Sequence, residues 1–267
     1  MEKFTSIILL TDFSEPAKNA IKYAVDAFGE EVEYNLINAY YARTSSATLL
    51  DLNDMLAKES LSGLESEIQW MKNEYPNLNL SVFPHSIFGS PVDAIKKLAI
   101  DHDHDLVIMG TKGASGVESV LFGSVASVVI RSTIVPVISV PPNCSFTGFG
   151  TLVFATDGQE IFNNKVVDPI EKLQDKFNTD VTVFSVDKPG QHSDLESLNL
   201  GLKNAKYATV EDEDVAGAVT RFCQEKNADL LAILPKHTGF FDRLFHKSVS
   251  KQLIEQAQMP ILGLENV

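Results

Sequence analysis

The chain repeats one strand–helix pattern twice, and this internal repeat constrains its fold more than any other feature. SIILLTD at residues 6–12 returns 145 residues later as TLVFATD, and DLVIM at residues 105–109 returns 124 residues later as DLLAI. VPVI at residues 135–138 returns as MPIL at the same distance of 124. The second copy is therefore about 21 residues shorter than the first, and we place the loss in the long second helical region. We expect domains at 1–143 and 147–267.

Within each copy, short apolar strands alternate with amphipathic helical segments, which is typical of a parallel α/β sheet with right-handed crossovers. Ser14 is a plausible N-cap, with Pro16 in the first turn of the helix that follows. The pattern predicts two tandem doubly wound, five-stranded, Rossmann-like domains. In the first copy the expected strands are 6–10, 34–39, 80–87, 106–109 and 135–140, and helices are expected after Ser14, over 48–73, and from Ser90 and Ser124.

Composition narrows the function. The formal net charge is −14, which argues against sequence-independent binding to nucleic acid, because such binding needs clustered Lys and Arg. No apolar run approaches the ~18 residues of a membrane helix, and the first 20 residues lack the features of a signal peptide. Cys144 and Cys223 are far apart and lack metal-ligand spacing. We expect free thiols and a cytoplasmic location.

A glycine-rich segment follows the fourth predicted strand. Gly110 and Gly113 are separated by two residues, and nine more residues lead to Gly123 and Ser124 at the start of a helix. Glycines let the backbone approach a phosphate closely, and the first amides of a helix form an anion site. The spacing is neither a Walker loop nor a dinucleotide fingerprint. Because ligands of open parallel sheets bind beyond the carboxyl ends of the strands, this loop should share a crevice with Asp12.

This glycine spacing, the Thr-Asp pair after the first strand and the Pro-Val strand at the end together resemble the universal stress protein family, over essentially the whole chain. The resemblance implies ATP, with Mg²⁺, as the ligand. It assigns Asp12, beside Thr11, to the adenine side and Ala39 to an apolar adenine contact. The phosphate and ribose contacts that it implies are Gly110, Gly113, Gly123, Ser124 and the backbone amide of Val125.

The second copy departs from this pattern. It keeps Asp157 and Ser248, but the three glycines align with Leu234, His237 and Lys247. We expect these side chains to occupy the space that phosphates need. The sequence therefore predicts one nucleotide per chain, bound in the first copy.

Several of these residues could instead have ordinary structural roles. Asp12 could be only a helix cap, and Lys112 could either reach a phosphate or be solvated. The run DHDHD at residues 101–105 looks like a metal cluster, but on a helix-to-strand connection we favour a solvated turn and expect no metal. A basic cluster in the second copy could bind another anion, but a surface or inter-domain contact is favoured; its members are His237, Arg243, His246 and Lys247.

The reading that fits best is a cytosolic ATP-binding stress or signalling module. A slow, metal-dependent ATPase using the same loop is one alternative, although no positioned base or arginine finger is evident. A scaffold that binds no nucleotide is another. Family members with one copy commonly dimerise through their last strand. The resemblance thus implies an intramolecular pseudo-dimer through 135–140 and 260–264, with a further homodimer left open.

Overall fold

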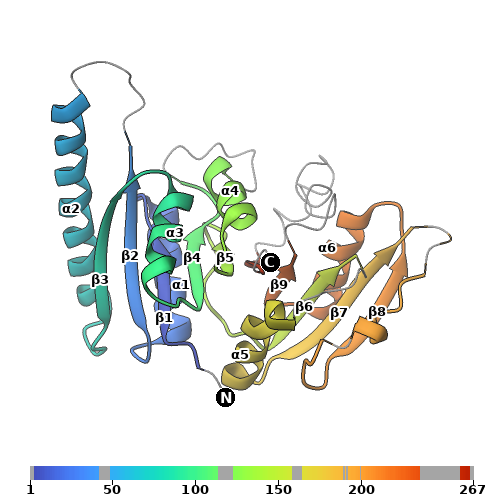
Figure 1. The fold of residues 1–267 in the computed structure, drawn as a ribbon. Coiled ribbons are helices and arrows are strands. Elements are labelled where there is room, and N and C mark those ends of the chain that lie inside the picture. Colours follow the sequence, from blue (N-terminus) through green and yellow to red (C-terminus); the bar gives the residue numbers. More distant parts are fainter. Residues whose placement is uncertain are drawn as a thin grey trace.

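The computed structural model describes residues 3–41, 49–113, 123–157, 164–188, 190, 192–198, 200–234 and 259–264. Its first half, residues 3–140, is called unit one below. Strands alternate with helices there, close to the predicted bounds, and helices lie on both sides of the strands (Figure 1). The elements are β1 (Ser6–Leu10), α1 (Glu15–Phe28), β2 (Glu33–Tyr40), α2 (Leu49–Glu74), β3 (Ser81–Phe88), α3 (Pro91–Asp101), β4 (Leu106–Gly110), α4 (Ser124–Ser132) and β5 (Val137–Val140).

Unit two, residues 151–264, repeats this order in its described residues, except at the position of α2. Between its second and third strands the described residues contain only a short 3₁₀ helix, where unit one has α2. The shortening thus falls in the predicted place. The elements are β6 (Thr151–Thr156), η1 (Asn164–Val167), α5 (Asp168–Phe177), β7 (Asp180–Asp187), η2 (Glu196–Leu198), β8 (Lys206–Glu211), α6 (Val215–Lys226), β9 (Leu230–Ile233) and β10 (Ile261–Gly263).

The strands of both units form one sheet in the order β3-β2-β1-β4-β5-β10-β9-β6-β7-β8. Neighbouring strands within each unit are parallel. The central strands are buried on both faces, as the continuous apolar runs predict. One buried cluster contains residues of α1, α2 and α5, and the other contains residues of α3, α4 and α6.

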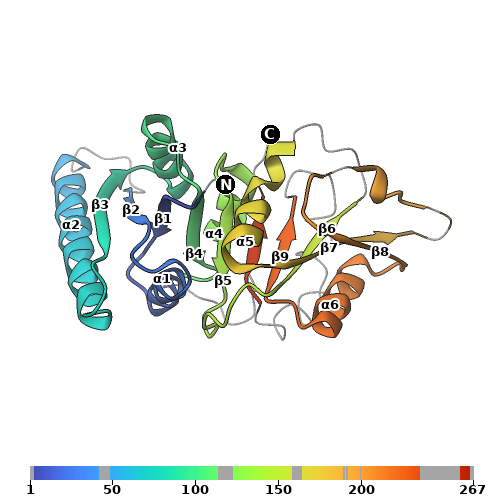
Figure 2. The same cartoon turned by 90° about the horizontal axis from the view of Figure 1, so that it is seen from below.

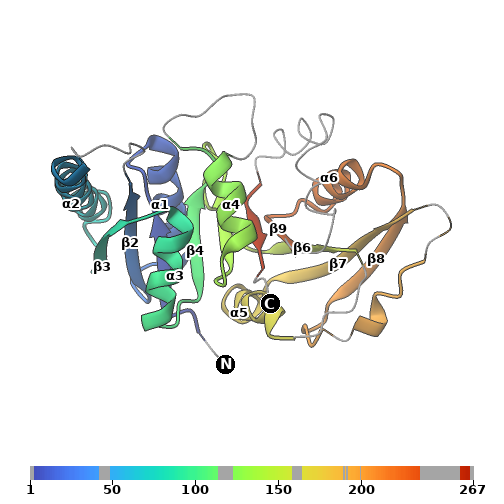
Figure 3. The same ribbon diagram turned by 45° about the horizontal axis from the view of Figure 1, so that its top comes forward.

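The two units join where β5 and β10 pair in antiparallel register. β10 is the red strand that lies between α4 and β9 in Figure 3. Ile138 lies opposite Leu262, and both side chains are fully buried. The hydroxyl of Ser139 also donates to the carbonyl oxygen of Ile261 at 3.2 Å. The unpaired edge that each final strand would present alone is thereby covered by the other.

Aromatic rings form a second contact between the units, which the sequence had not indicated. The ring of Phe28 in α1 lies 6.0 Å from that of Phe177 in α5. Phe149, in the connection between the units, lies 5.0 Å from Phe177 and 6.0 Å from Tyr23. The connection at residues 141–150 is therefore anchored in the shared core.

The prediction that DHDHD at residues 101–105 is a solvated turn is wrong for Asp105. Its Oδ2 accepts hydrogen bonds from the backbone amides of Thr5 and Ser6, at 2.7 and 3.0 Å. Its Oδ1 lies 2.5 Å from Nζ of Lys172 in α5, and both side chains are largely buried. Asp229, the counterpart in unit two, likewise accepts from the amide of Thr151 at 2.9 Å. This aspartate position therefore caps the first strand of each unit, and in the described residues no metal-binding cluster is found.

Helix α2 is the longest helix described and lies against β2 and β3 at one end of the sheet (Figure 2). It buries Leu64 and Met71 completely and leaves half of Met55 and Leu61 exposed. Within the described ranges, no helix combines the length and apolar character needed to cross a bilayer.

Candidate functional site

The candidate site lies at the point in the sheet where the chain stops adding strands on one side of β1 and continues on the other side. β1 pairs with β2 on one side and with β4 on the other, so their carboxyl ends form the switch point at which such sheets bind ligands. Thr11 and Asp12 follow β1, and Thr111 to Gly113 follow β4. The two segments meet as the sequence predicts.

A cavity of about 300 Å³ opens at this point, and all nine predicted site residues line it. It thus brings together Thr11, Asp12, Ala39, Gly110, Lys112, Gly113, Gly123, Ser124 and Val125. Sequence reasoning had missed the rest of the wall, although most of these residues adjoin predicted ones in the chain. The additional residues are Leu10, Ala17, Tyr41, Pro91, Met109, Thr111 and Ala126.

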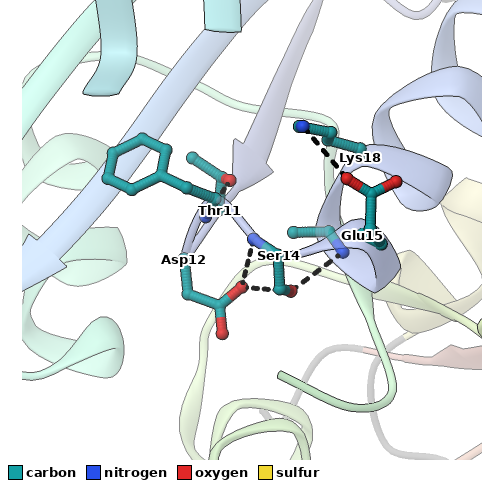
Figure 4. A network of polar contacts seen from close by, with 7 residues as sticks. Thr11, Asp12, Ser14, Glu15 and Lys18 are labelled. Carbon is teal, nitrogen blue, oxygen red and sulfur yellow. Dashed lines mark hydrogen bonds and ion pairs between the residues drawn. The ribbon is translucent and has the colours of Figure 1, made fainter. Parts of the chain in front are cut away.

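The turn between β1 and α1 is held by a chain of hydrogen bonds (Figure 4). Oδ1 of Asp12 accepts from the amide and the hydroxyl of Ser14, at 3.2 and 2.5 Å. The hydroxyl oxygen of Ser14 in turn accepts from the amide of Ala17 at 3.3 Å. Ser14 is thus the N-cap of α1, as predicted. Asp12 supports that cap from outside the helix and also lines the cavity, so the two readings of this residue do not exclude each other.

Gly110 is required by the protein's own packing, and Gly113 leaves space for the carboxylate of Asp12. A β-carbon on Gly110 would lie 2.9 Å from the carbonyl oxygen of Pro16, so this glycine lets α1 pack against β4. A β-carbon on Gly113 would lie 2.5 Å from Oδ2 of Asp12. The sequence argument explained both glycines by the approach of a phosphate, and for Gly110 the structure identifies helix packing as the constraint.

The N-terminus of α4 is open toward the cavity. Its cap, Gly123, makes no side-chain hydrogen bond, and the first turn contains no acidic residue. Ser124 and Val125 are exposed there. The amide of Gly123 donates to the carbonyl oxygen of Thr111 at 2.8 Å, which joins the two ends of the glycine-rich loop. Free amides at a helix N-terminus attract anions.

Thr111 adds an unsatisfied polar group to this wall. Thr111 is 2% exposed, and its Oγ1 has no hydrogen-bond partner among the described residues. Buried hydroxyl groups without partners are uncommon in folded proteins. A ligand with hydrogen-bonding atoms would supply the missing partner.

Unit two does not repeat this arrangement in the residues described. Residues 11–14 alone connect β1 to α1, whereas 157–167 connect β6 to α5. Leu234, which aligns with Gly110, was expected in the phosphate space, but it is 6% exposed and packs in the core cluster with residues of α5. The predictions for His237, Lys247 and Ser248, and those for Arg243 and His246, lie outside the described residues.

A comparison with models of known protein families gives the family of this chain. The model described as the universal stress protein family matches residues 3–141, more than half of the chain. The chain belongs to the universal stress protein family. A universal stress protein of Methanocaldococcus jannaschii is 26% identical to it over 144 residues, which are 51% of this chain and 82% of the relative. One from Mycobacterium tuberculosis is 25% identical over 143 residues, 52% of this chain and 98% of the relative.

The two-unit fold also has a counterpart within the family. The crystal structure of a universal stress protein from Archaeoglobus fulgidus covers 97% of this chain and 96% of its own, with a TM-score of 0.64. At 19% identity, this likeness concerns the fold alone. Both halves of the present universal stress protein are therefore included in the shared architecture.

Proposed function

We propose that this universal stress protein binds ATP, together with Mg²⁺, in the cavity of unit one, and that nucleotide occupancy changes its conformation or its partners during stress. The observation that carries the proposal is the convergence on one cavity of a helix N-terminus whose cap residue is a glycine, of Asp12 next to the glycine at position 113, and of an apolar wall that includes Ala39. These are the groups that a phosphate chain, an adenine amine and an adenine ring require.

The residues divide naturally between the two ends of such a ligand. The backbone amides of Ser124 and Val125 suit the phosphates because the cap residue before them, Gly123, has no side chain, and the hydroxyl of Ser124 is a further donor. Asp12 is the acceptor for the exocyclic amine of adenine, and Ala39 is an apolar neighbour of its ring. Mg²⁺ would be held chiefly by phosphate oxygens, as is usual for this ion, and it would neutralise part of their charge.

We propose one ATP per chain. Four residues, 11–14, separate β1 from α1 and include Asp12, whereas 157–167 separate β6 from α5. Asp157, which aligns with Asp12, therefore follows its strand in a different setting. This difference supports a site in unit one alone.

The test is calorimetry of the full chain with ATP and Mg²⁺, using Asp12→Ala and Asp157→Ala as a matched pair. We expect one site, weakened by the first change and unaffected by the second. Phosphate release is followed in parallel, and steady turnover would favour the slow ATPase instead. Absence of binding would reject the proposal in favour of a scaffold, and two equal sites would reject the restriction to unit one.

We further propose that the β5–β10 pairing makes the chain an intramolecular pseudo-dimer that acts in the cytoplasm. The buried pair Ile138 and Leu262 supports the first part. Burial raises the pKa of Cys144 to about 11 and that of Cys223 to about 12; both are free thiols, in keeping with a reducing compartment. Sedimentation of the full chain distinguishes a monomer from a further homodimer.

A further inference from the structure

Glu67 of α2 is a buried acidic residue that the proposed site does not use. It is 3% exposed, and within the described residues neither carboxyl oxygen makes a hydrogen bond of good geometry, although the side chain of Thr11 lies near enough to stabilise the charged carboxylate. Burial raises the pKa of Glu67 above the usual range; Asp12 and Glu15 act in the same direction, whereas Thr11 and Lys18 oppose it. These neighbours belong to the β1–α1 turn and the start of α1, so the carboxyl group of Glu67 is on the side of α2 that faces the turn carrying Asp12.

A second contact connects the same face of α2 to the same turn. The ring of Phe13 lies against Gly63, where an added β-carbon would be 2.5 Å from its Cζ. Gly63 and Glu67 are four residues apart and thus share a helix face. Phe13 has a φ of 64°, a left-handed conformation that is rare for a bulky residue. The hydroxyl of Thr11 holds this conformation by accepting from the amide of Phe13 at 2.9 Å.

An unsatisfied buried carboxyl group and a strained backbone residue both lower stability, and apolar substitutes are often neutral or stabilising. Such features persist where they serve a site and the surrounding structure enforces them. Here the two features lie on opposite sides of one contact: Glu67 is in α2, and Phe13 is in the segment Thr11–Phe13. Packing alone does not require a carboxyl group at position 67.

We propose that Glu67 is a positioning residue of the nucleotide site: its carboxyl group holds Thr11 from behind, so that the turn at Phe13 presents Asp12 to the cavity. The inference rests on the proposed ATP site of unit one. Glu67 does not touch the ligand. In its protonated form it can donate to or accept from the Thr11 hydroxyl without adding a second negative charge behind Asp12.

The experiment measures ATP affinity and thermal unfolding of the full chain for Glu67→Gln and Glu67→Leu. Glutamine keeps the shape and hydrogen-bonding capacity of a neutral carboxyl group, and we expect its affinity to stay within about threefold of the parent. Leucine removes both, so affinity should fall about tenfold while the unfolding temperature stays level or rises. Glu65→Gln, an exposed change two residues away on α2, is the control and should match the parent.

A substitution at Gly63 changes the contact between α2 and the turn without altering Glu67. It keeps the proposal testable if Glu67→Leu does not fold. Gly63→Ala would displace the ring of Phe13 and should weaken ATP binding, although alanine favours a helix. If the parent binds ATP and the variants at both positions bind equally well, the positioning role is wrong and the site stands. If the parent binds no ATP, the proposed function fails, and this inference fails with it.

Discussion

Gly113 leaves no room for a side chain beside Asp12: a β-carbon on Gly113 would lie 2.5 Å from Oδ2 of Asp12. The two residues follow different strands, β4 and β1, which pair side by side. The glycine-rich loop and the acidic turn therefore form one structural unit. Substitutions at either position test the proposed site.

Gly113→Val should abolish ATP binding. The branched side chain would collide with the Asp12 carboxylate and enter the cavity, because its first carbon already violates van der Waals contact. Calorimetry measures the loss, and circular dichroism shows whether the fold is kept. Gly123→Ala tests a second glycine of the loop and should remain folded, since its β-carbon would come no closer than 3.5 Å to any atom of the described residues. Unchanged affinity in folded Gly113→Val would rule out this site.

Asp12→Ala should weaken ATP binding and reduce the preference for adenine over guanine. The carboxylate can accept a hydrogen bond from adenine's amine, whereas guanine presents a carbonyl oxygen in its place. Loss of such a bond costs about 1–3 kcal/mol, or about 5- to 150-fold in affinity. Competition between ATP and GTP measures the selectivity. A variant as selective as the parent would leave Asp12 with its role beside the Ser14 cap only.

Val137→Lys should destabilise the joint between the units. Val137 is 1% exposed and lies opposite Gly263 in the β5–β10 pair. An unpaired charge buried there should cost about 3 kcal/mol or more in the free energy of unfolding. Urea denaturation measures this change. Val128→Lys, at a position of α4 that is 52% exposed, is the matched control. Equal stability of the two variants would contradict a structural role for the joint.

Stability should decrease as the pH is lowered, because two half-buried histidines become protonated. Ser6 Oγ lies 2.8 Å from His104 Nδ1, and Asn35 connects Ser6 to His85 through contacts of 3.0 and 2.9 Å. Burial, with a smaller contribution from His102, lowers the pKa of His85 and of His104. Because the unfolded chain then binds protons first, this stability is fully present above the ordinary pKa of about 6.5 and is lost below it.

Urea midpoints at pH 7.5 and pH 5.5 measure that dependence, with His104→Gln compared against the parent. The variant should show a smaller loss between the two pH values, since one titrating group has been removed. His192→Gln, at an exposed position, should behave like the parent. The role of the histidines would be contradicted if the urea midpoint of the parent did not change between the two pH values. It would also be contradicted if His104→Gln lost as much stability as the parent.

The sequence alone determined the repeated α/β units, the place of the shortening and nine of the residues that line the cavity. Those features depend on local periodicity, on glycine spacing and on the general position of ligands at strand ends. Ser14 could likewise be recognised as a cap because its partner is three residues away.

Only the tertiary structure decided which long-range contacts form. Gly110 is needed because the carbonyl oxygen of Pro16 approaches it, Asp105 faces Lys172 of the other unit, and Glu67 is buried behind Thr11. None of these pairings has a local signature, because each depends on how a helix is oriented on the sheet. A sequence pattern specifies which face of a helix is apolar, but the packed fold selects which polar group that face meets, and at what distance.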